Sequence, residues 1–158
     1  MATFTAARAA STFPISKPTV GGVLCVAQGT ITVSANPVAN DIYEMCRLPA
    51  GAVVVGGMFY SADLDTNAAE TLDLDVGWTA NGVDAANLTG FGNFGVQGTD
   101  TVAGIKAESG YQYPLGGVLI TTGPQAFAAE TVVVVNTIAT AATFAAGSMS
   151  VVVYYYVP

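Results

Sequence analysis

Apolar side chains fill residues 131–157 and predict two buried β-strands there. The segment reads TVVVVNTI, then ATAATFAAG, then SMSVVVYYYV, and no charge interrupts it. β-Branched and aromatic residues of this kind favour strands. Alternation gives the last strand two faces, one with Met149, Val151, Val153, Tyr155 and Val157 and the other with Ser150, Val152, Tyr154 and Tyr156. Both faces are apolar in the second half, so we expect a second sheet to cover one and another copy of the chain to cover the other.

The segment TLDLDVGW, residues 71–78, shows a different pattern, in which apolar and acidic positions alternate. Such alternation is typical of a strand with one buried and one solvated face. The pattern predicts that Asp73 and Asp75 point to water, where a neutral replacement changes little. The predicted core positions are Leu72, Leu74, Val76 and Trp78.

Shorter apolar runs predict the remaining strands. Residues 52–62 read as a buried strand kinked at Gly56-Gly57, and residues 23–35 as a short strand pair bent at Gln28-Gly29. DIYEMCRL, residues 41–48, has a possible helix capping box, but Pro49 ends it after one short run, so a strand is preferred. TVAGIKA and YQYPLGGVLIT predict further strands. The Gly- and Asn-rich residues 79–98 predict a surface excursion.

Together these elements predict an all-β fold, an antiparallel β-sandwich or jelly roll of about eight to nine strands. A chain of 158 residues suits one domain, predicted over residues 21–158. Residues 1–20 lack acids and have the composition of an organelle transit peptide. We favour an extended arm, because Pro14 and Pro18 hold the backbone extended. We expect this arm to dock on a partner through Phe4, Phe13 and Ile15.

The composition favours an assembled protein over a free monomer. Hydrophobic residues make up 52% of the chain and charged residues 9%, against roughly 25% charged residues in an average domain. Subunit contacts would hide this weakly polar surface, so we expect a homo-oligomer, most simply a trimer. The net charge of −7 argues against binding nucleic acid. No apolar run approaches the roughly 20 residues of a membrane helix, so no membrane partner is expected.

The residue types exclude most catalytic chemistry. The chain has no histidine, which removes Ser-His-Asp and Cys-His arrangements and His-rich metal centres. It has no phosphate-binding Gly-rich loop, so we expect neither an enzyme nor a cofactor. Cys25 and Cys46 lie among apolar residues and are expected to be buried thiols, with a single bridge as the alternative.

Asp63, Asp65 and Asn67 are spaced like the start of a calcium-binding loop. The glycine that such a loop needs for its turn is missing, and Glu70 comes too early to be the bidentate ligand. A turn held by Asp and Asn side chains is therefore preferred, and calcium is kept as the alternative. Tyr154 and Tyr156 are interpreted as subunit-contact residues in preference to sugar-binding ones.

Two runs of the sequence carry a family resemblance. DIYEMCRLPAGAVVVGGMFYSADLDTNAAETLDLDVGW, residues 41–78, and ETVVVVNTIATAATFAAGSMSVVVYYYV, residues 130–157, resemble small β-sandwich structural proteins of tailed bacteriophages. The resemblance implies a virion component, most often a head decoration or cement protein on the capsid surface, commonly a trimer. It also implies the major capsid shell as partner and assembly in the host cytoplasm. The Gly/Asn-rich middle and the arm differ from the usual pattern.

Three functions follow from this resemblance. The first is a capsid-decorating protein whose arm attaches to a neighbour or to the shell. The alternative is a receptor- or glycan-binding module of a phage fibre, spike or tail, with residues 79–98 and the tyrosines as its site. A shell that packages the genome directly is disfavoured. Arg8 and Lys17 are the two positive charges of residues 1–40, and they would neutralise little of the genome's phosphate.

Overall fold

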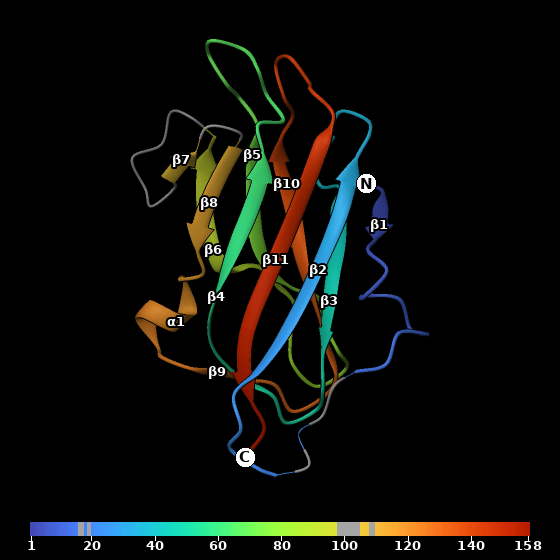
Figure 1. Cartoon of the computed structure of the whole chain (residues 1–158), viewed down its shortest axis with the longest axis vertical. Helices are drawn as coiled ribbons and strands as arrows, with labels where there is room; N and C mark the ends of the chain where they lie inside the picture. The colour runs from blue at the N-terminus through green and yellow to red at the C-terminus, as the bar shows by residue number, and fades with distance from the viewer. Residues whose placement is uncertain (16–17, 19, 98–104, 108–109) are drawn as a thin grey trace.

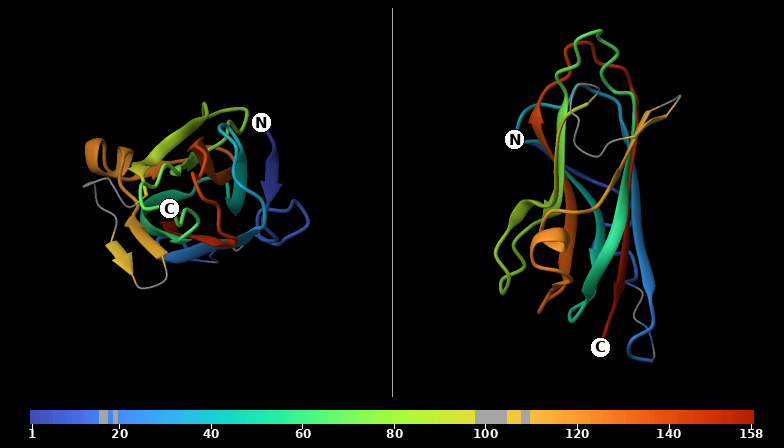
Figure 2. Two further views of the ribbon diagram at one scale, coloured as in Figure 1. Left: turned by 90° about the horizontal axis from the view of Figure 1, so that it is seen from above. Right: turned by 90° about the vertical axis from the view of Figure 1, so that its left-hand side faces the viewer.

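The computed structural model describes residues 1–15, 18, 20–97, 105–107 and 110–158. These residues form eleven strands and one short helix. The strands build two sheets packed face to face, seen from the front in Figure 1 and edge-on in the right-hand view of Figure 2. The predicted β-sandwich is confirmed. The strand count exceeds the prediction because β1 and β9 are too short to leave a pattern and β6 was assigned to an excursion.

We call the sheet with order β1-β3-β10-β5-β6 sheet A, and the sheet with order β2-β11-β4-β8-β7 sheet B. The strands of sheet A are β1 Thr3–Thr5, β3 Ile42–Leu48, β10 Thr131–Ala139, β5 Asp73–Trp78 and β6 Asn87–Val96. The strands of sheet B are β2 Cys25–Val33, β11 Gly147–Tyr156, β4 Val53–Ala62, β8 Gly110–Pro114 and β7 Ile105–Ala107, with β9 Gln125–Ala126 also paired to β4. All pairings are antiparallel except that of β1 with β3.

Strand β11 has the two faces that its sequence predicts. It lies between β2 and β4, so both of its edges are hydrogen-bonded. Met149, Val151, Val153 and Tyr155 are each at most 1% exposed and belong to the core. Tyr154, on the other face, is 37% exposed. The alternation was readable because every inward position of this strand is large and apolar.

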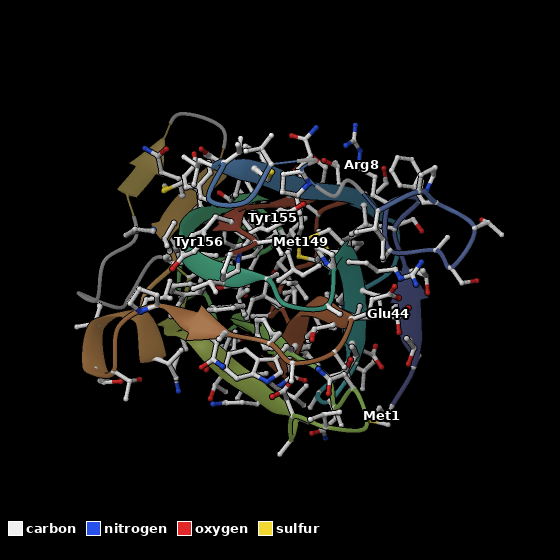
Figure 3. All side chains as sticks on the ribbon, turned by 90° about the horizontal axis from the view of Figure 1, so that it is seen from below. Met1, Arg8, Glu44, Met149, Tyr155 and Tyr156 are labelled. Atoms are coloured by element: carbon white, nitrogen blue, oxygen red, sulfur yellow. The ribbon has the colours of Figure 1, made fainter. Side chains whose placement is uncertain are left out.

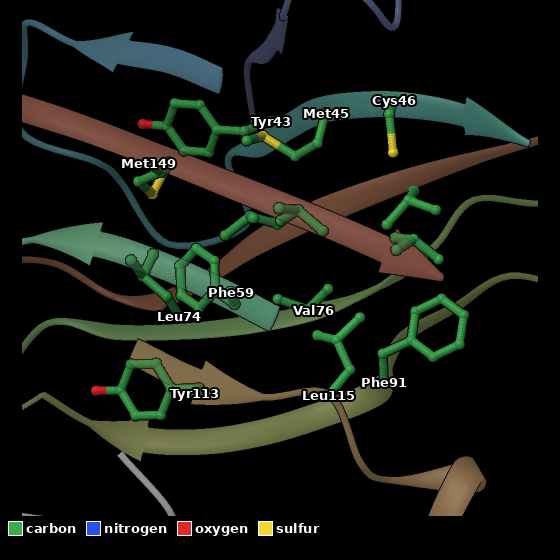
Figure 4. Packing of buried hydrophobic residues seen from close by; sticks show 14 of the residues in the cluster. Tyr43, Met45, Cys46, Phe59, Leu74, Val76, Phe91, Tyr113, Leu115 and Met149 are labelled. Atoms are coloured by element: carbon green, nitrogen blue, oxygen red, sulfur yellow. The ribbon is translucent and has the colours of Figure 1, made fainter. Parts of the chain in front are cut away.

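The core joins the two sheets through aromatic side chains (Figure 4). Phe59 of β4 is fully buried and stacks on Phe94 of β6, with ring centroids 5.8 Å apart, and on Tyr113 of β8 at 5.9 Å. Trp78 of β5 packs against Phe127 edge to face at 5.1 Å. These contacts bury large apolar areas from both layers, which is the main source of stability in a fold of this type.

Strand β5 confirms one half of its prediction and contradicts the other. Leu72, Leu74, Val76 and Trp78 are all at most 5% exposed in the core. Asp75, which was predicted to face water, is fully buried. It lies between its register partners Asn136 of β10 and Asn93 of β6, and its Oδ1 accepts a hydrogen bond from Phe94 N at 3.3 Å. Two flanking strands therefore exclude water from a position that the alternation alone assigns to solvent.

This burial makes Asp75 sensitive to pH. Burial, reinforced by the charge of Asp73, raises the pKa of Asp75 to about 6, and the Phe94 N–H offsets only part of this. The folded state therefore holds the proton more tightly than the unfolded state does. Stability from this group is fully present below pH ~4 and falls as pH rises to about 6.

We expect Asp75→Asn to raise the free energy of unfolding by about 1–3 kcal/mol at pH 8. The amide is neutral, and its oxygen still accepts from Phe94 N. Denaturant unfolding between pH 4 and 8 checks this, with Asp73→Asn as a control that removes the neighbouring charge and retains the buried carboxyl. A variant no more stable than the parent at pH 8 would show that Asp75 is hydrated.

Gly29 was predicted to bend a strand pair, and this is wrong. Strand β2 runs without a break from Cys25 to Val33. A Cβ on Gly29 would collide with the backbone of Met45 in β3, so this glycine lets β2 of sheet B approach β3 of sheet A. The sequence shows a glycine in a strand, and either a bend or a close backbone approach satisfies that observation.

Two further segments differ from prediction. Residues 87–96 were assigned to a surface excursion, yet they form β6 and pair with β5. Their glycines and bulges hide the strand pattern. Val118–Thr121 forms helix α1, where a strand was predicted; it follows Gly117, whose φ of 54° turns the chain. No helix in the described ranges combines the length and hydropathy of a membrane span.

Both cysteines are free thiols in this structure. Cys46 is buried and Cys25 is half-buried. Burial raises the pKa of the Cys46 thiol to about 12, with a small opposing effect from Arg8, so this thiol stays protonated and unreactive near neutral pH.

Candidate interaction surfaces

The start of the chain lies against its own sheet. Strand β1 pairs in parallel with β3, and Ala2 N donates to Asp41 Oδ1 at 2.7 Å. Thr5 Oγ1 donates to Glu44 Oε2 at 2.8 Å. Phe4, predicted to contact a partner, stacks on the ring of Tyr43 at 4.8 Å and stays 40% exposed. The first residues of the arm thus add an edge strand to sheet A.

The next arm residues lie beside β2 and β3. Phe13 is 38% exposed, and the guanidinium carbon of Arg8 is 5.3 Å from its ring centroid. Ile15 is half-buried, and with Phe13 and Arg8 it lines a cavity of about 60 Å³ that reaches Tyr155. Figure 3 shows Arg8 and Glu44 on the side of the molecule that carries this segment. The division of the chain at residue 20 stays a prediction.

Asp65, one of the calcium candidates, is fully buried and holds two loops together. Its carboxylate accepts five backbone N–H groups, from Asn67, Thr71, Leu72, Ala142 and Thr143. Burial alone would raise the pKa of Asp65, but these hydrogen bonds outweigh it and hold the pKa well below its usual range. The sequence pattern correctly predicted a polar turn. The Asp65 carboxylate also binds the backbone of a second loop far along the chain.

The other two candidates take part in the same region. Asn67 Nδ2 donates to Thr143 Oγ1 at 3.0 Å, and Asn67 Oδ1 accepts from Ala69 N at 2.9 Å. Asp63 is half-buried. Across the described ranges, no group of three or more His, Cys, Asp or Glu side chains is placed to hold a metal ion. Calcium binding stays a prediction, and a cation here would compete with the N–H groups for the oxygens of Asp65.

Tyr154 and Tyr156 lie on the outer face of sheet B. Tyr154 has Val26 of β2 and Gly56 of β4 as register partners, and Tyr156 pairs with Val53. Val26 is 52% exposed and Val55 is 43% exposed. The contact role of Tyr154 and Tyr156 stays a prediction, and no such prediction was made from the sequence for the exposed Val26 and Val55 on the neighbouring strands. Exposed valines within apolar strands carry no local signal that separates them from core residues.

The two sheets differ in charge. Strands β2, β4, β8, β9 and β11 of sheet B contain no Asp, Glu, Lys or Arg. In sheet A, β3 carries Glu44 and Arg47, and β5 carries Asp73 and Asp75. Arg47 forms an ion pair with Glu130 in the loop before β10. The outer face that these five strands of sheet B form therefore carries no charged side chain.

A shallow cavity of about 270 Å³ opens at one end of this face. Its lining is uncharged and combines hydroxyl, amide and aromatic groups, from Tyr60, Ser61, Ala62, Gly110, Tyr111, Gln112, Ser148 and Ser150. Of the alternative glycan site, residues 87–96 form β6 of sheet A, whereas Tyr154 lies on sheet B. Residue 98 of that prediction lies outside the described residues.

Chains of three phage capsids share this fold. A chain of the Ralstonia phage GP4 capsid matches with a TM-score of 0.73 and 24% identity, covering 99% of this chain and 97% of that one. A chain of the Cyanophage Pam1 capsid asymmetric unit matches with a TM-score of 0.66 and 30% identity, covering 94% and 96%. A chain of the acidic stable capsid of Helicobacter pylori bacteriophage KHP30 matches with a TM-score of 0.56 and 18% identity, covering 88% and 91%. No protein-family model and no curated protein matches the sequence.

The fold, the uncharged sheet face and these likenesses define a structural protein of the phage virion. The chain belongs to the same family as the chain of the Cyanophage Pam1 capsid, with which it shares 30% identity over nearly the full length of both.

Proposed function

We propose that this protein decorates or cements the capsid of a tailed phage from the outside, as a homotrimer bound to the shell of the major capsid protein. The observation that carries the proposal is the similarity to capsid chains, which extends over nearly the whole length of this chain and of each matched chain. The role is non-enzymatic.

Charge supports a position outside the shell. The net charge is −7, and a protein that encloses packaged genome must instead neutralise phosphate. A decorating protein meets solvent and other proteins, where an acidic surface favours solubility. The N-terminal arm is the proposed attachment device, since Phe4 and Phe13 are 40% and 38% exposed and Phe13 lies beside Arg8.

Electron cryo-microscopy of phage particles that contain the chain tests the proposal. We expect density for the sandwich on the outer surface of an icosahedral head, in contact with the major capsid shell. Density confined to a fibre, spike or tail would contradict the decorating role.

The arm has a separate test, a Phe13→Ser and Ile15→Ser double substitution. It leaves β1 and its bonds to β3 in place and removes two apolar anchors. We expect binding to undecorated particles to weaken by roughly tenfold or more, with the melting temperature changed by only a few degrees. Val83→Ser, at a loop position that is 70% exposed, is the control. If the double variant decorates particles like the parent, the arm is not the attachment device.

A second candidate function, binding of a neutral glycan, is favoured by the uncharged cavity beside Tyr60 and Gln112. Aromatic rings and amide or hydroxyl groups are the groups that contact sugars. Titration with neutral oligosaccharides tests it, and loss of a binding signal in Gln112→Ala would assign the signal to this cavity. Equal binding by the variant would exclude the cavity as the site.

A further inference from the structure

The outer face of sheet B carries a continuous apolar patch. We call it the tyrosine face and define it as Leu24, Val26, Val55, Val152, Tyr154 and Tyr156. Register places these side chains together: Tyr154 lies across from Val26 on one side and from Gly56, next to Val55, on the other. Leu24 is 62% exposed, directly before β2. The arm meets the patch at its β2 edge, where Phe13, Pro14 and Ile15 line a small cavity with Val26. The patch stays open elsewhere, with Val55 43% and Tyr154 37% exposed.

The glycine opposite Tyr154 matters for the shape of the patch. A Cβ on Gly56 would lie 3.8 Å from the Tyr154 ring, so the ring rests over the bare backbone. The Tyr154 ring therefore lies beside the Gly56 backbone, near the centre of the patch. Tyrosine side chains near the centre of an apolar surface are typical anchors of protein interfaces.

The outer face of sheet B, of which the tyrosine face is the apolar part, has a size that suits a protein interface. Strands β2, β4 and β11 are each nine or ten residues long, and β8 adds a fourth strand. At ~3.3 Å per residue and ~4.8 Å between strands, the sheet presents on the order of 600 Å² in projection. Rough side-chain surfaces expose more than their projection, so this approaches the roughly 800 Å² per partner of a stable interface.

Charge identifies the occupant of this face. Two copies of a chain with a net charge of −7 repel each other, and a contact through sheet A would bring charged side chains of β3 and β5, among them Glu44 and Asp73, into the interface. Burying like carboxylates against one another is costly. The tyrosine face contains no charge, so it is the surface through which identical acidic chains meet at least cost. A shell protein of different charge would not need an uncharged face for its contact with this chain.

We propose that copies of this chain associate with one another through the tyrosine face. The proposal rests on the proposed function in one respect, because it names the partner of this face in the decorating oligomer. The hydroxyl groups at the far end of the face then form its polar rim, including Thr30 and Ser150, whose side-chain oxygens are 2.7 Å apart. The side of the molecule that carries the arm then remains available to contact the capsid shell.

Light scattering of the purified full-length chain tests the proposal. We expect a mass that is a multiple of 16.0 kDa for the parent and 16.0 kDa for Tyr154→Glu and Val55→Glu. A buried unpaired carboxylate at this site should weaken association by ~100-fold or more. Ile138→Glu is the matched control, because Ile138 is 44% exposed on β10 of sheet A, and it should leave the oligomer intact.

A footprinting measurement on the unmodified chain covers the case in which a glutamate variant fails to fold. Hydroxyl-radical labelling of Tyr154 and Leu24 should fall as the protein concentration rises through the dissociation constant, while Val83 labels equally throughout. A parent that is monomeric at micromolar concentration, or an oligomer whose Tyr154 stays fully reactive, overturns the proposal.

Particle binding separates this inference from the proposed function. If the chain decorates heads and yet stays monomeric in solution, and Tyr154→Glu abolishes decoration, the face belongs to the shell and the inference fails while the decorating function stands. If the chain forms the oligomer through this face and is absent from heads, the inference stands and the decorating function fails.

Discussion

Replacing Asp65 with alanine should lower the free energy of unfolding by about 4 kcal/mol or more. Its carboxylate accepts backbone N–H groups at 2.7 Å from Thr71 and at 2.9 Å from both Ala142 and Thr143. Alanine leaves these donors without an acceptor in a buried site. The variant also loses the connection between the loop before β5 and the loop before β11, regions 77 residues apart in sequence.

Urea unfolding at a fixed protein concentration measures the effect, and Thr66→Ala is the control. Thr66 is adjacent and exposed, so its replacement should change stability by at most ~0.5 kcal/mol. Similar effects for the two substitutions would show that the Asp65 hydrogen bonds contribute little. The depressed pKa of Asp65 also predicts that its contribution is present above pH ~4 and is lost below it. Its sign is opposite to that of Asp75, so the parent should be most stable near pH ~4.

Replacing Phe59 with alanine should cost about 3–5 kcal/mol, the range for large aromatic residues in a core. Phe59 is fully buried and contacts rings from both sheets, so its removal leaves a cavity between the layers. The adjacent Tyr60 points to the opposite face and is 39% exposed, so Tyr60→Ala should cost at most about 1 kcal/mol. Denaturant unfolding of both variants checks the register of β4, because a shift by one residue would exchange the two results.

The sequence alone determined the class of fold and the inward face of its clearest strands. Leu74 and Val76 of β5 and Val151 and Val153 of β11 were assigned to the core because period-two alternation is a local property of a strand. The uncharged composition of the apolar strands was also plain, and it led to an assembly as the expected state. Tyr154 was predicted to be a subunit-contact residue on this basis.

Other features depended on which strands became neighbours. Asp75 is buried because β6 and β10 flank it. Position 29 has no room for a side chain because β3 passes beside it. The tyrosine face combines Val26, Val55 and Tyr154 from three strands far apart in the chain.

Alternation tells which residues of one strand share a side, and this information ends where the strand ends. Strand order, the bulges that shift register and the approach of one sheet to the other are set by long-range packing. Only the tertiary structure therefore decided how far water reaches Asp75 and which exposed apolar side chains lie together on one face.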